Sequence, residues 1–189
     1  MPDNTDHDLL QIAKDAALKA GEAIMRLYDV GDFESYQKAD ESPVTSADYK
    51  ANEIITDILT RMSPDIPILS EETKHASLEE RKTWKRYWLI DPIDGTQEFI
   101  ARSGDFAVNI ALIEDNKPKI GVIFWPPGQS LYYALAGHGA FKDSPEASGP
   151  ISVRKLDDPH NSVVILAISR RQPRERVISK LCAKRVYQT

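Results

Sequence analysis

The sequence predicts an α+β fold in which helices are layered on a sheet of mostly antiparallel strands. Two amphipathic helical patterns open the chain, and a series of short apolar segments separated by turn residues follows them. Most of these segments are close enough in sequence to pair as hairpins, which favours an antiparallel sheet. The chain has 189 residues, of which 41% are hydrophobic and 28% are charged, and this composition is typical of a globular protein.

The two helices are predicted from apolar residues that recur at helical spacing. The first pattern ends before Gly31, a residue type that often terminates helices, and a polar loop over residues 32–43 follows. The second pattern starts near Thr45, with Asp48 three residues later in a capping-box-like arrangement, and ends at Ser63-Pro64. The apolar positions are Leu9, Ile12, Ala13, Ala16, Ala20, Ile24 and Leu27 in the first helix, and Ala51, Ile54, Ile55, Ile58, Leu59 and Met62 in the second.

The strands are predicted from short apolar segments with turn residues between them. Asp115-Asn116-Lys117-Pro118 forms a turn between two of these segments, and Gly137, Gly139 and Gly149 mark further breaks. The predicted strands cover residues 66–69, 87–90, 106–113, 119–125, 131–135 and 151–154.

The last part of the chain has a different pattern. Residues 162–168 form a continuous apolar run, as in a buried strand, and residues 174–186 have a helical pattern. We therefore predict one domain over residues 1–160 and the beginning of a second, α/β domain over residues 161–189, with the remainder of that domain absent.

Charge and cysteine content narrow the class of protein. The net charge of −5 gives no reason to expect a nucleic-acid polymer as partner, and no apolar run reaches the roughly 20 residues that a transmembrane helix needs. A single cysteine, Cys182, fits a reducing compartment, so the cytoplasm is expected. A homodimer and a peripheral association with the inner membrane stay open.

Carboxylates follow three of the predicted elements. Glu71-Glu72 follows the strand 66–69, Asp91 and Asp94 follow the strand 87–90, and Asp48 lies in the first turn of the second helix. If these groups converge, each pair at 4 Å repels by about 4 kcal/mol at an effective dielectric constant near 20, so strong cationic compensation is needed. Oxygen ligands without His or Cys favour Mg²⁺ or Mn²⁺ over zinc.

The spacing within Asp91-Pro92-Ile93-Asp94-Gly95-Thr96 adds to this interpretation. Pro92 favours an extended conformation at Asp91, and the tight path can direct Asp91, Asp94 and the Ile93 carbonyl to one side. Gly95-Thr96 then opens a short helix, whose first N–H groups suit a phosphate. Each feature alone has an ordinary explanation as a turn, a helix cap or a solvated loop, and only their combination favours a catalytic site.

These residues give the chain a resemblance to the inositol-monophosphatase-like superfamily of metal-dependent phosphatases. The matching segments are Pro43-Val44-Thr45-Ser46-Ala47-Asp48, Leu69-Ser70-Glu71-Glu72 and Trp88-Leu89-Ile90-Asp91-Pro92-Ile93-Asp94-Gly95-Thr96. Within the superfamily, Gln97-Glu98-Phe99-Ile100 and residues 106–113 are most similar to the 3'(2'),5'-bisphosphate nucleotidases of the CysQ type. The resemblance implies a layered α/β sandwich and hydrolysis of adenosine 3',5'-bisphosphate, a small phosphate ester, to AMP and phosphate.

The resemblance also implies the role of each site residue. Glu71, Asp91, Asp94 and the Ile93 carbonyl would bind Mg²⁺. Asp48 and Thr96 would position and activate the attacking water, with Glu71 also counted among the catalytic residues. The substrate phosphate would lie against Gly95 and Thr96, next to the metal ligands Glu71, Ile93 and Asp94.

Two departures from the family pattern matter. CysQ-type enzymes commonly have Lys where this chain has Gln97, and their second domain supplies a further metal-binding Asp in a Trp-Asp motif that this chain does not contain. The chain is therefore expected to be weakly active or inactive by itself. Two alternatives stay open: an inositol monophosphatase or other sugar-phosphate phosphatase, and a non-catalytic fragment or regulatory binding module.

Overall fold

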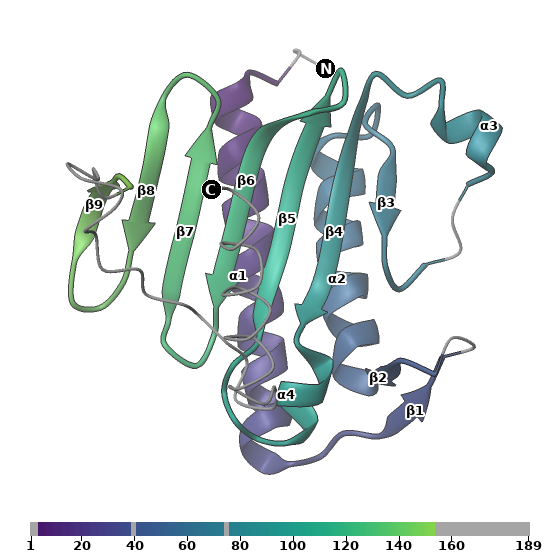
Figure 1. Cartoon of the computed structure of the whole chain (residues 1–189), viewed down its shortest axis with the longest axis vertical. Coiled ribbons are helices and arrows are strands. Elements are labelled where there is room, and N and C mark those ends of the chain that lie inside the picture. Colours follow the sequence, from purple (N-terminus) through teal and green to yellow (C-terminus); the bar gives the residue numbers. More distant parts are fainter. Residues whose placement is uncertain (1–3, 39–40, 74–75, 154–189) are drawn as a thin grey trace, which may run out of the picture. The chain divides into compact units, whose positions relative to one another are not determined.

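A computed structural model describes residues 4–38, 41–73 and 76–153 of the chain. In this part of the chain, helices lie on one face of a seven-stranded sheet, as Figure 1 shows. The helices are α1 (Asp6–Val30), α2 (Ser46–Met62), α3 (Leu78–Arg81) and α4 (Thr96–Ile100). The strands are β1 (Ser35–Gln37), β2 (Pro43–Thr45), β3 (Ile68–Ser70), β4 (Arg86–Asp94), β5 (Ala107–Glu114), β6 (Lys117–Trp125), β7 (Ser130–Leu135), β8 (Gly139–Asp143) and β9 (Ser148–Ile151).

The sheet confirms the predicted α+β class. Its strands lie in the order in which they occur in the chain, from β3 to β9. The β3–β4 pair is parallel and the remaining neighbouring pairs, from β4–β5 to β8–β9, are antiparallel. The β5–β6 hairpin turns at Asp115 and Asn116, both with positive φ (48° and 60°), which is the conformation of a tight hairpin turn.

The two long helices confirm the helical patterns in the sequence. Thr5 and Thr45 each form a capping box with an Asp three residues later, and Gly31 ends α1 in the left-handed conformation. These caps satisfy N–H and C=O groups that have no partner inside the helix. The helix boundaries are therefore specified by local chemistry as well as by tertiary packing.

The core lies between α1, α2 and the sheet. α1 crosses β5, β6 and β7, while α2 lies against β4 (Figure 1). The fit between α1 and β6 is close enough that a Cβ atom on Gly21 would lie 2.3 Å from the ring of Phe124. Trp88, at 0% exposure, fills the space between α2 and β4, and its indole N–H donates to Ser63 Oγ at 3.0 Å.

Three sequence predictions need correction. The segment 32–43 is not wholly a loop, because residues 35–37 pair with residues 43–45 as a small antiparallel ladder. Gly139 and Gly149 lie within the strands β8 and β9 instead of separating strands. β8 was not predicted, and β9 meets the predicted strand 151–154 at Ile151, because both strands are short and have no alternating apolar pattern.

The predicted second domain cannot be compared with this fold. The compact unit that contains the described residues ends at Ser152. The predicted strand 162–168 and helix 174–186 lie outside the described residues. The division at residue 160 stays a prediction.

Candidate metal and phosphate site

Parallel pairing of β3 with β4 brings the first two acidic segments together. The register places Ser70 opposite Ile90, and the Glu71 N–H donates to the Ile90 carbonyl at 3.2 Å. Glu71 and Asp91 follow these paired residues directly. They therefore emerge at neighbouring positions on adjacent strands, as the sequence predicts for carboxylates at strand ends.

A β-bulge shapes the second acidic segment. The sequence predicts that the strand ends at Ile90, but β4 continues to Asp94 because its ladder with β5 resumes after an irregularity. Between Asp91 and Asp94, β4 advances by three residues while β5 advances by two, from Asn109 to Ala107. Such a bulge redirects side chains and is common beside functional sites.

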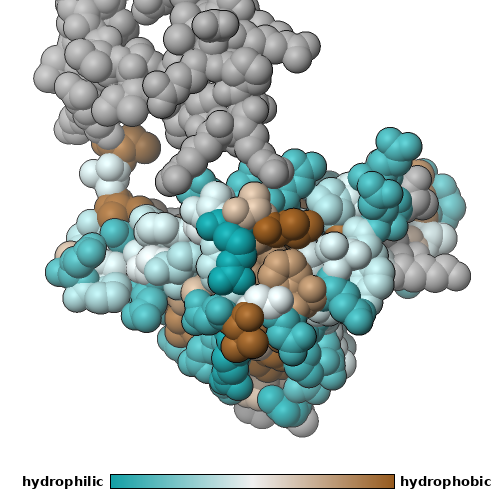
Figure 2. Space-filling view, turned by 90° about the horizontal axis from the view of Figure 1, so that it is seen from below, coloured by the Kyte–Doolittle hydropathy of each residue, from teal (hydrophilic) through white to brown (hydrophobic). Residues whose placement is uncertain are grey.

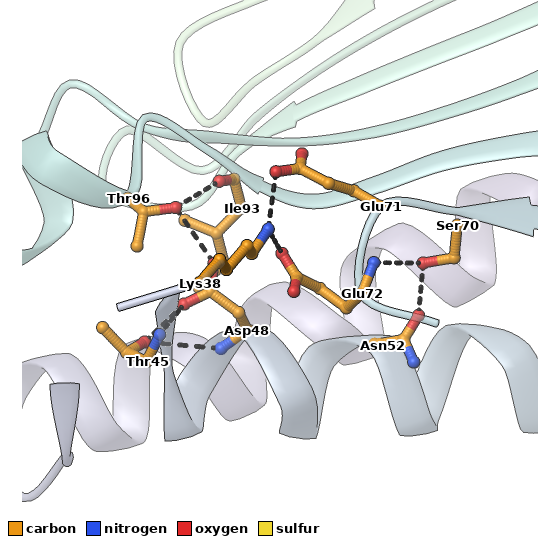
Figure 3. Close-up of polar contacts among 9 residues, drawn as sticks. All are labelled: Lys38, Thr45, Asp48, Asn52, Ser70, Glu71, Glu72, Ile93 and Thr96. Carbon is orange, nitrogen blue, oxygen red and sulfur yellow. Dashed lines mark hydrogen bonds and ion pairs between the residues drawn. The ribbon is translucent and has the colours of Figure 1, made fainter. Parts of the chain in front are cut away.

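Asp48 and Thr96 are joined by a hydrogen bond. Asp48 is fully buried, its Oδ2 accepts from the Thr45 N–H at 2.8 Å, and its Oδ1 accepts from the Thr96 hydroxyl at 3.1 Å (Figure 3). The Thr96 hydroxyl also lies 3.1 Å from the Ile93 carbonyl, and its single hydrogen can go to only one of these acceptors at a time. Burial raises the pKa of Asp48, although these hydrogen bonds oppose the shift.

Gly95 permits the turn that presents Thr96. Its φ is +95°, a conformation that residues with a side chain rarely adopt. A Cβ atom there would lie 2.8 Å from the Asp105 carbonyl oxygen. The glycine thus allows the chain to turn directly into α4 beneath the loop that precedes β5.

Lys38 is the main feature that the sequence interpretation missed. The sequence patterns assign Lys38 no role, yet its Nζ lies 2.7 Å from a carboxylate oxygen of Glu71 and 2.7 Å from one of Glu72 (Figure 3). Glu72 had no assigned role, and its side chain is only 4% exposed. Burial raises the pKa of Glu72 and lowers that of Lys38, but the two ion pairs leave the pKa of Lys38 above its usual value. The need for a compensating cation was the available signal, but the sequence did not show which residue supplies it.

Asp91 is the least satisfied group of the site. Its Oδ1 is buried and has no hydrogen-bond partner among the described residues. Burial, and then repulsion from Glu71, Asp94, Glu72 and Asp48, raises the pKa of Asp91 to about 7. One ammonium group, from Lys38, therefore does not offset the negative charge gathered here.

The donor set fits a hard divalent cation. Carboxylates and a carbonyl are the ligands that Mg²⁺ and Ca²⁺ prefer, and an orphaned carboxylate oxygen is available at Asp91. Across the described ranges, no three His, Cys, Asp or Glu side chains are already arranged to hold a metal ion. Glu71 instead faces Lys38, and Asp94 accepts a hydrogen bond from Asn109. Binding a cation would thus require Glu71 to exchange one cation for another.

The strand ends border an open hollow. It measures about 540 Å³ and its lining includes Glu71, Asp91 and Asn109. Figure 2 views the molecule from the end at which β3 and β4 finish, and hydrophilic residues gather there beside smaller hydrophobic areas. A larger hollow of about 850 Å³ lies between α1 and the strands from β6 to β9, but it contains none of the site carboxylates. The smaller hollow therefore borders the site at Glu71 and Asp91, and most of its remaining lining is apolar.

Comparison with known proteins identifies the family. The model of the inositol monophosphatase family matches residues 5–187. The chain belongs to this family. The chain is 48% identical over 144 residues to the 3'(2'),5'-bisphosphate nucleotidase CysQ of Salmonella typhimurium, and 47% identical over 142 residues to that of Aggregatibacter actinomycetemcomitans. The resemblance stated from the three sequence motifs is confirmed.

Solved structures of family members agree with the fold. CysQ from Bacteroides thetaiotaomicron matches with a TM-score of 0.73 and 35% identity, over 94% of this chain and 68% of that chain. The extragenic suppressor protein suhB from Bartonella henselae matches with a TM-score of 0.66 and 32% identity, over 77% of this chain and 55% of that chain. The layered α+β fold is thus shared with both.

The chain spans only part of its curated relatives. The alignments cover 76% of this chain and 58% of the Salmonella protein, and 75% of this chain and 52% of the Aggregatibacter protein. Over the described residues, no helix combines the length and apolar character needed to cross a membrane. The roles assigned to individual site residues stay predictions.

Proposed function

We propose that the chain contributes to Mg²⁺-dependent hydrolysis of a phosphomonoester, with adenosine 3',5'-bisphosphate as the substrate and AMP and phosphate as the products. The observation that carries this proposal is the unpartnered Oδ1 of Asp91, which lies in a carboxylate cluster that also contains the Asp48–Thr96 pair. The choice of substrate is supported by the names of the relatives in Salmonella and Aggregatibacter. The cytoplasm remains the expected location.

Four groups would hold the metal ion: the carboxylates of Glu71, Asp91 and Asp94, and the Ile93 carbonyl. The family is metal-dependent, and the oxygen-only donor set makes Mg²⁺ our choice. When bound, Mg²⁺ would polarise the phosphoryl oxygens, lower the pKa of a bound water and stabilise the leaving oxygen. The paired strands β3 and β4 position these four groups, and strands of a sheet are a rigid support for a binding site.

Asp48 and Thr96 would provide the general-base function. When the Thr96 hydroxyl donates to Asp48, its oxygen lone pairs can accept a hydrogen bond from water. As the water attacks phosphorus, its proton would pass to Thr96 while the Thr96 proton passes to Asp48. The raised pKa of Asp48 makes this carboxylate a better proton acceptor than a solvated one. The P–O bond to the 3' oxygen would break, and that oxygen would take up a proton from solvent to complete AMP.

Gly95 and Thr96 would seat the phosphate at the start of α4. Gly95 has no side chain to obstruct the approach of a phosphate, and it gives α4 no side-chain cap. An anion could therefore interact with the N–H groups at this turn.

A second candidate is an inositol monophosphatase or another sugar-phosphate phosphatase. This alternative is supported by the match of residues 5–187 to the model of the inositol monophosphatase family. The metal and water residues are the same under both proposals. Only the substrate that the site accepts separates them.

The test is phosphate release by the 189-residue chain with Mg²⁺. The chain is expected to be weakly active by itself, and we expect its release from adenosine 3',5'-bisphosphate, although low, to exceed release from inositol 1-phosphate and from AMP. Thr96→Val should lower this activity by about 100-fold or more, because it removes the hydroxyl that contacts Asp48. Thr83→Val, which removes a hydroxyl that donates to the Glu80 carbonyl of α3 at 2.7 Å, is the matched control and should leave activity unchanged.

Each contrary outcome has a defined meaning. A preference for inositol 1-phosphate would overturn the nucleotidase assignment and support the second candidate. No phosphate release from any ester, with Mg²⁺ binding intact, would support the non-catalytic fragment. Equal activity of Thr96→Val and wild type would remove Thr96 from the mechanism.

A further inference from the structure

Asn109 lies beside the acidic segment and has no role in the site as described so far. Its Cα is paired with that of Asp91 across the β4–β5 ladder, and the next register pair joins Asp94 to Ala107. The Asn109 Nδ2 donates to Asp94 Oδ2 at 3.1 Å. The side chain therefore starts opposite one acidic residue and reaches the other across the bulge.

Asn109 lies on the same face of the sheet as two of the site carboxylates. Cross-strand partners point to the same face, so Asn109 and Asp91 share the face opposite α1 and α2. Both residues line the 540 Å³ hollow together with Glu71. The Asn109 amide thus lies beside Asp94, on the face of Asp91 and Glu71, and not in the core between sheet and helices.

Asp94 needs such a contact to keep one orientation. Its side chain is exposed and follows the irregular part of β4, so packing does not fix its rotamer. A neutral amide can bind one carboxylate oxygen and leave the other oxygen available. Glu71 differs, because Lys38 holds it with a positive charge that competes with any incoming cation.

We propose that Asn109 is a positioning residue that orients Asp94 towards the metal ion. Through the Asn109 side chain, strand β5 would contribute to the metal site. The inference rests on the proposed function, because it assumes that Asp94 is a ligand. Hydrogen-bond partners of metal ligands commonly change metal affinity by about 10- to 100-fold when they are removed. Asn109 would act at the lower end of this range, since Asp94 is exposed to water.

The test measures Mg²⁺ affinity by calorimetry for the wild-type chain and for Asn109→Leu, which keeps the side-chain size but removes the donor. We expect the dissociation constant for Mg²⁺ to increase about tenfold. At saturating Mg²⁺, the kcat for phosphate release should return to within about twofold of the wild-type value, because Asn109 does not contact the water or the phosphate. The same substitution in an Asp94→Asn background should cause no further loss.

The matched control is Asn4→Leu. Asn4 also donates its side-chain amide to a single oxygen, the Met62 carbonyl at 2.6 Å, at the opposite end of α2 from Asp48. It should leave Mg²⁺ affinity unchanged.

The outcomes separate the inference from the proposed function. Mg²⁺ binding by the wild type with equal affinity in Asn109→Leu would overturn the role of Asn109 alone. An additional loss in the Asp94→Asn background would show that Asn109 acts by another route and would also overturn it. The absence of Mg²⁺ binding by the wild type would overturn the proposed function.

Discussion

The two ends of β4 both gather charged side chains, but they balance them differently. At the first end, Arg86 and Lys119 face Asp6 and Glu114, with two cations for two carboxylates. Lys119 Nζ lies 3.0 Å from Asp6 and 3.5 Å from Glu114. A hydrogen bond from Lys119, aided by Arg86, lowers the pKa of Asp6.

At the other end of β4 the carboxylates greatly outnumber the cations. Lys38 is the cation that contacts them among the described residues, and the pKa of Asp91 rises to about 7. The carboxylates there are Asp48, Glu71, Glu72, Asp91 and Asp94.

The contrast separates a structural charge cluster from a functional one. A balanced network stabilises the ionised form of its own carboxylates, so it can connect α1 to the sheet without any ligand. An excess of carboxylates destabilises their ionised forms until a cation arrives. The charge imbalance is thus a better guide to the site than the number of acidic residues.

The largest expected effect is on the folding stability of the metal-free protein. Asp91 has a pKa of about 7 in the folded chain against 3.8 for the ordinary side chain. The folded state therefore binds more protons in this window, and stability falls as the pH rises from about 4 to about 7. Asp91→Asn removes this penalty and should stabilise the metal-free chain by about 2 kcal/mol at pH 8, since some water still reaches the group.

Chemical denaturation at several pH values measures this effect. The gain in the free energy of unfolding that Asp91→Asn gives over the wild type should decrease steadily as the pH is lowered from 8 to 4. At one fixed Mg²⁺ concentration, the metal should stabilise the wild type more than the variant. A variant that is less stable than the wild type at pH 8 without metal would contradict the account.

Removing a cation from the cluster at the first end of β4 should lower the free energy of unfolding, which is a smaller effect of opposite sign. Arg86→Met leaves Asp6 with Lys119 alone and should destabilise the chain by about 1 kcal/mol at low salt. Since the pKa of Asp6 is lowered, this contribution exists above pH 4 and is lost as the pH falls through the folded-state pKa. Chemical denaturation of the wild type and of Arg86→Met at pH 7 and pH 3 checks this difference in stability. The affinity of Arg86→Met for Mg²⁺ should equal that of the wild type.

The smallest effect concerns Lys38. Lys38→Met removes the ammonium group that competes for Glu71, so the affinity for Mg²⁺ should increase about three- to fivefold. Lys50→Met breaks an exposed ion pair of the same 2.7 Å length, with Glu53, and should leave the affinity unchanged. Weaker Mg²⁺ binding by Lys38→Met would mean that Lys38 supports the site and does not compete in it.

Local patterns predicted much of the fold. Helical spacing and capping residues placed α1 and α2, and apolar segments identified the central strands of the sheet. The small ladder of β1 with β2 and the strand β8 were missed, and β9 was predicted too late in the chain, at 151–154. These strands depend on pairing with a neighbour, and their sequences carry no strong periodic signal.

The acidic residues of the site were predicted, but their contacts were not. Glu71 and Asp91 were expected at strand ends, and the β3–β4 register brings them to neighbouring positions. The ion pairs of Lys38 with Glu71 and Glu72 join residues 33 and 34 positions apart, and the hydrogen bond from Asn109 to Asp94 joins residues 15 positions apart. Sequence spacing cannot show such contacts, because they arise only when the sheet has formed.

The most direct test of the charge imbalance is a calorimetric titration of Mg²⁺ at pH 7 into the wild-type chain, Asp91→Asn and Arg86→Met. The account predicts that Mg²⁺ binds to the wild type and displaces protons, because Asp91 must ionise to bind it. Arg86→Met should bind equally well, and Asp91→Asn should bind at least about tenfold more weakly. Equal binding by Asp91→Asn and the wild type, or no binding by the wild type, would contradict the claim that the acidic end of β4 is a metal site.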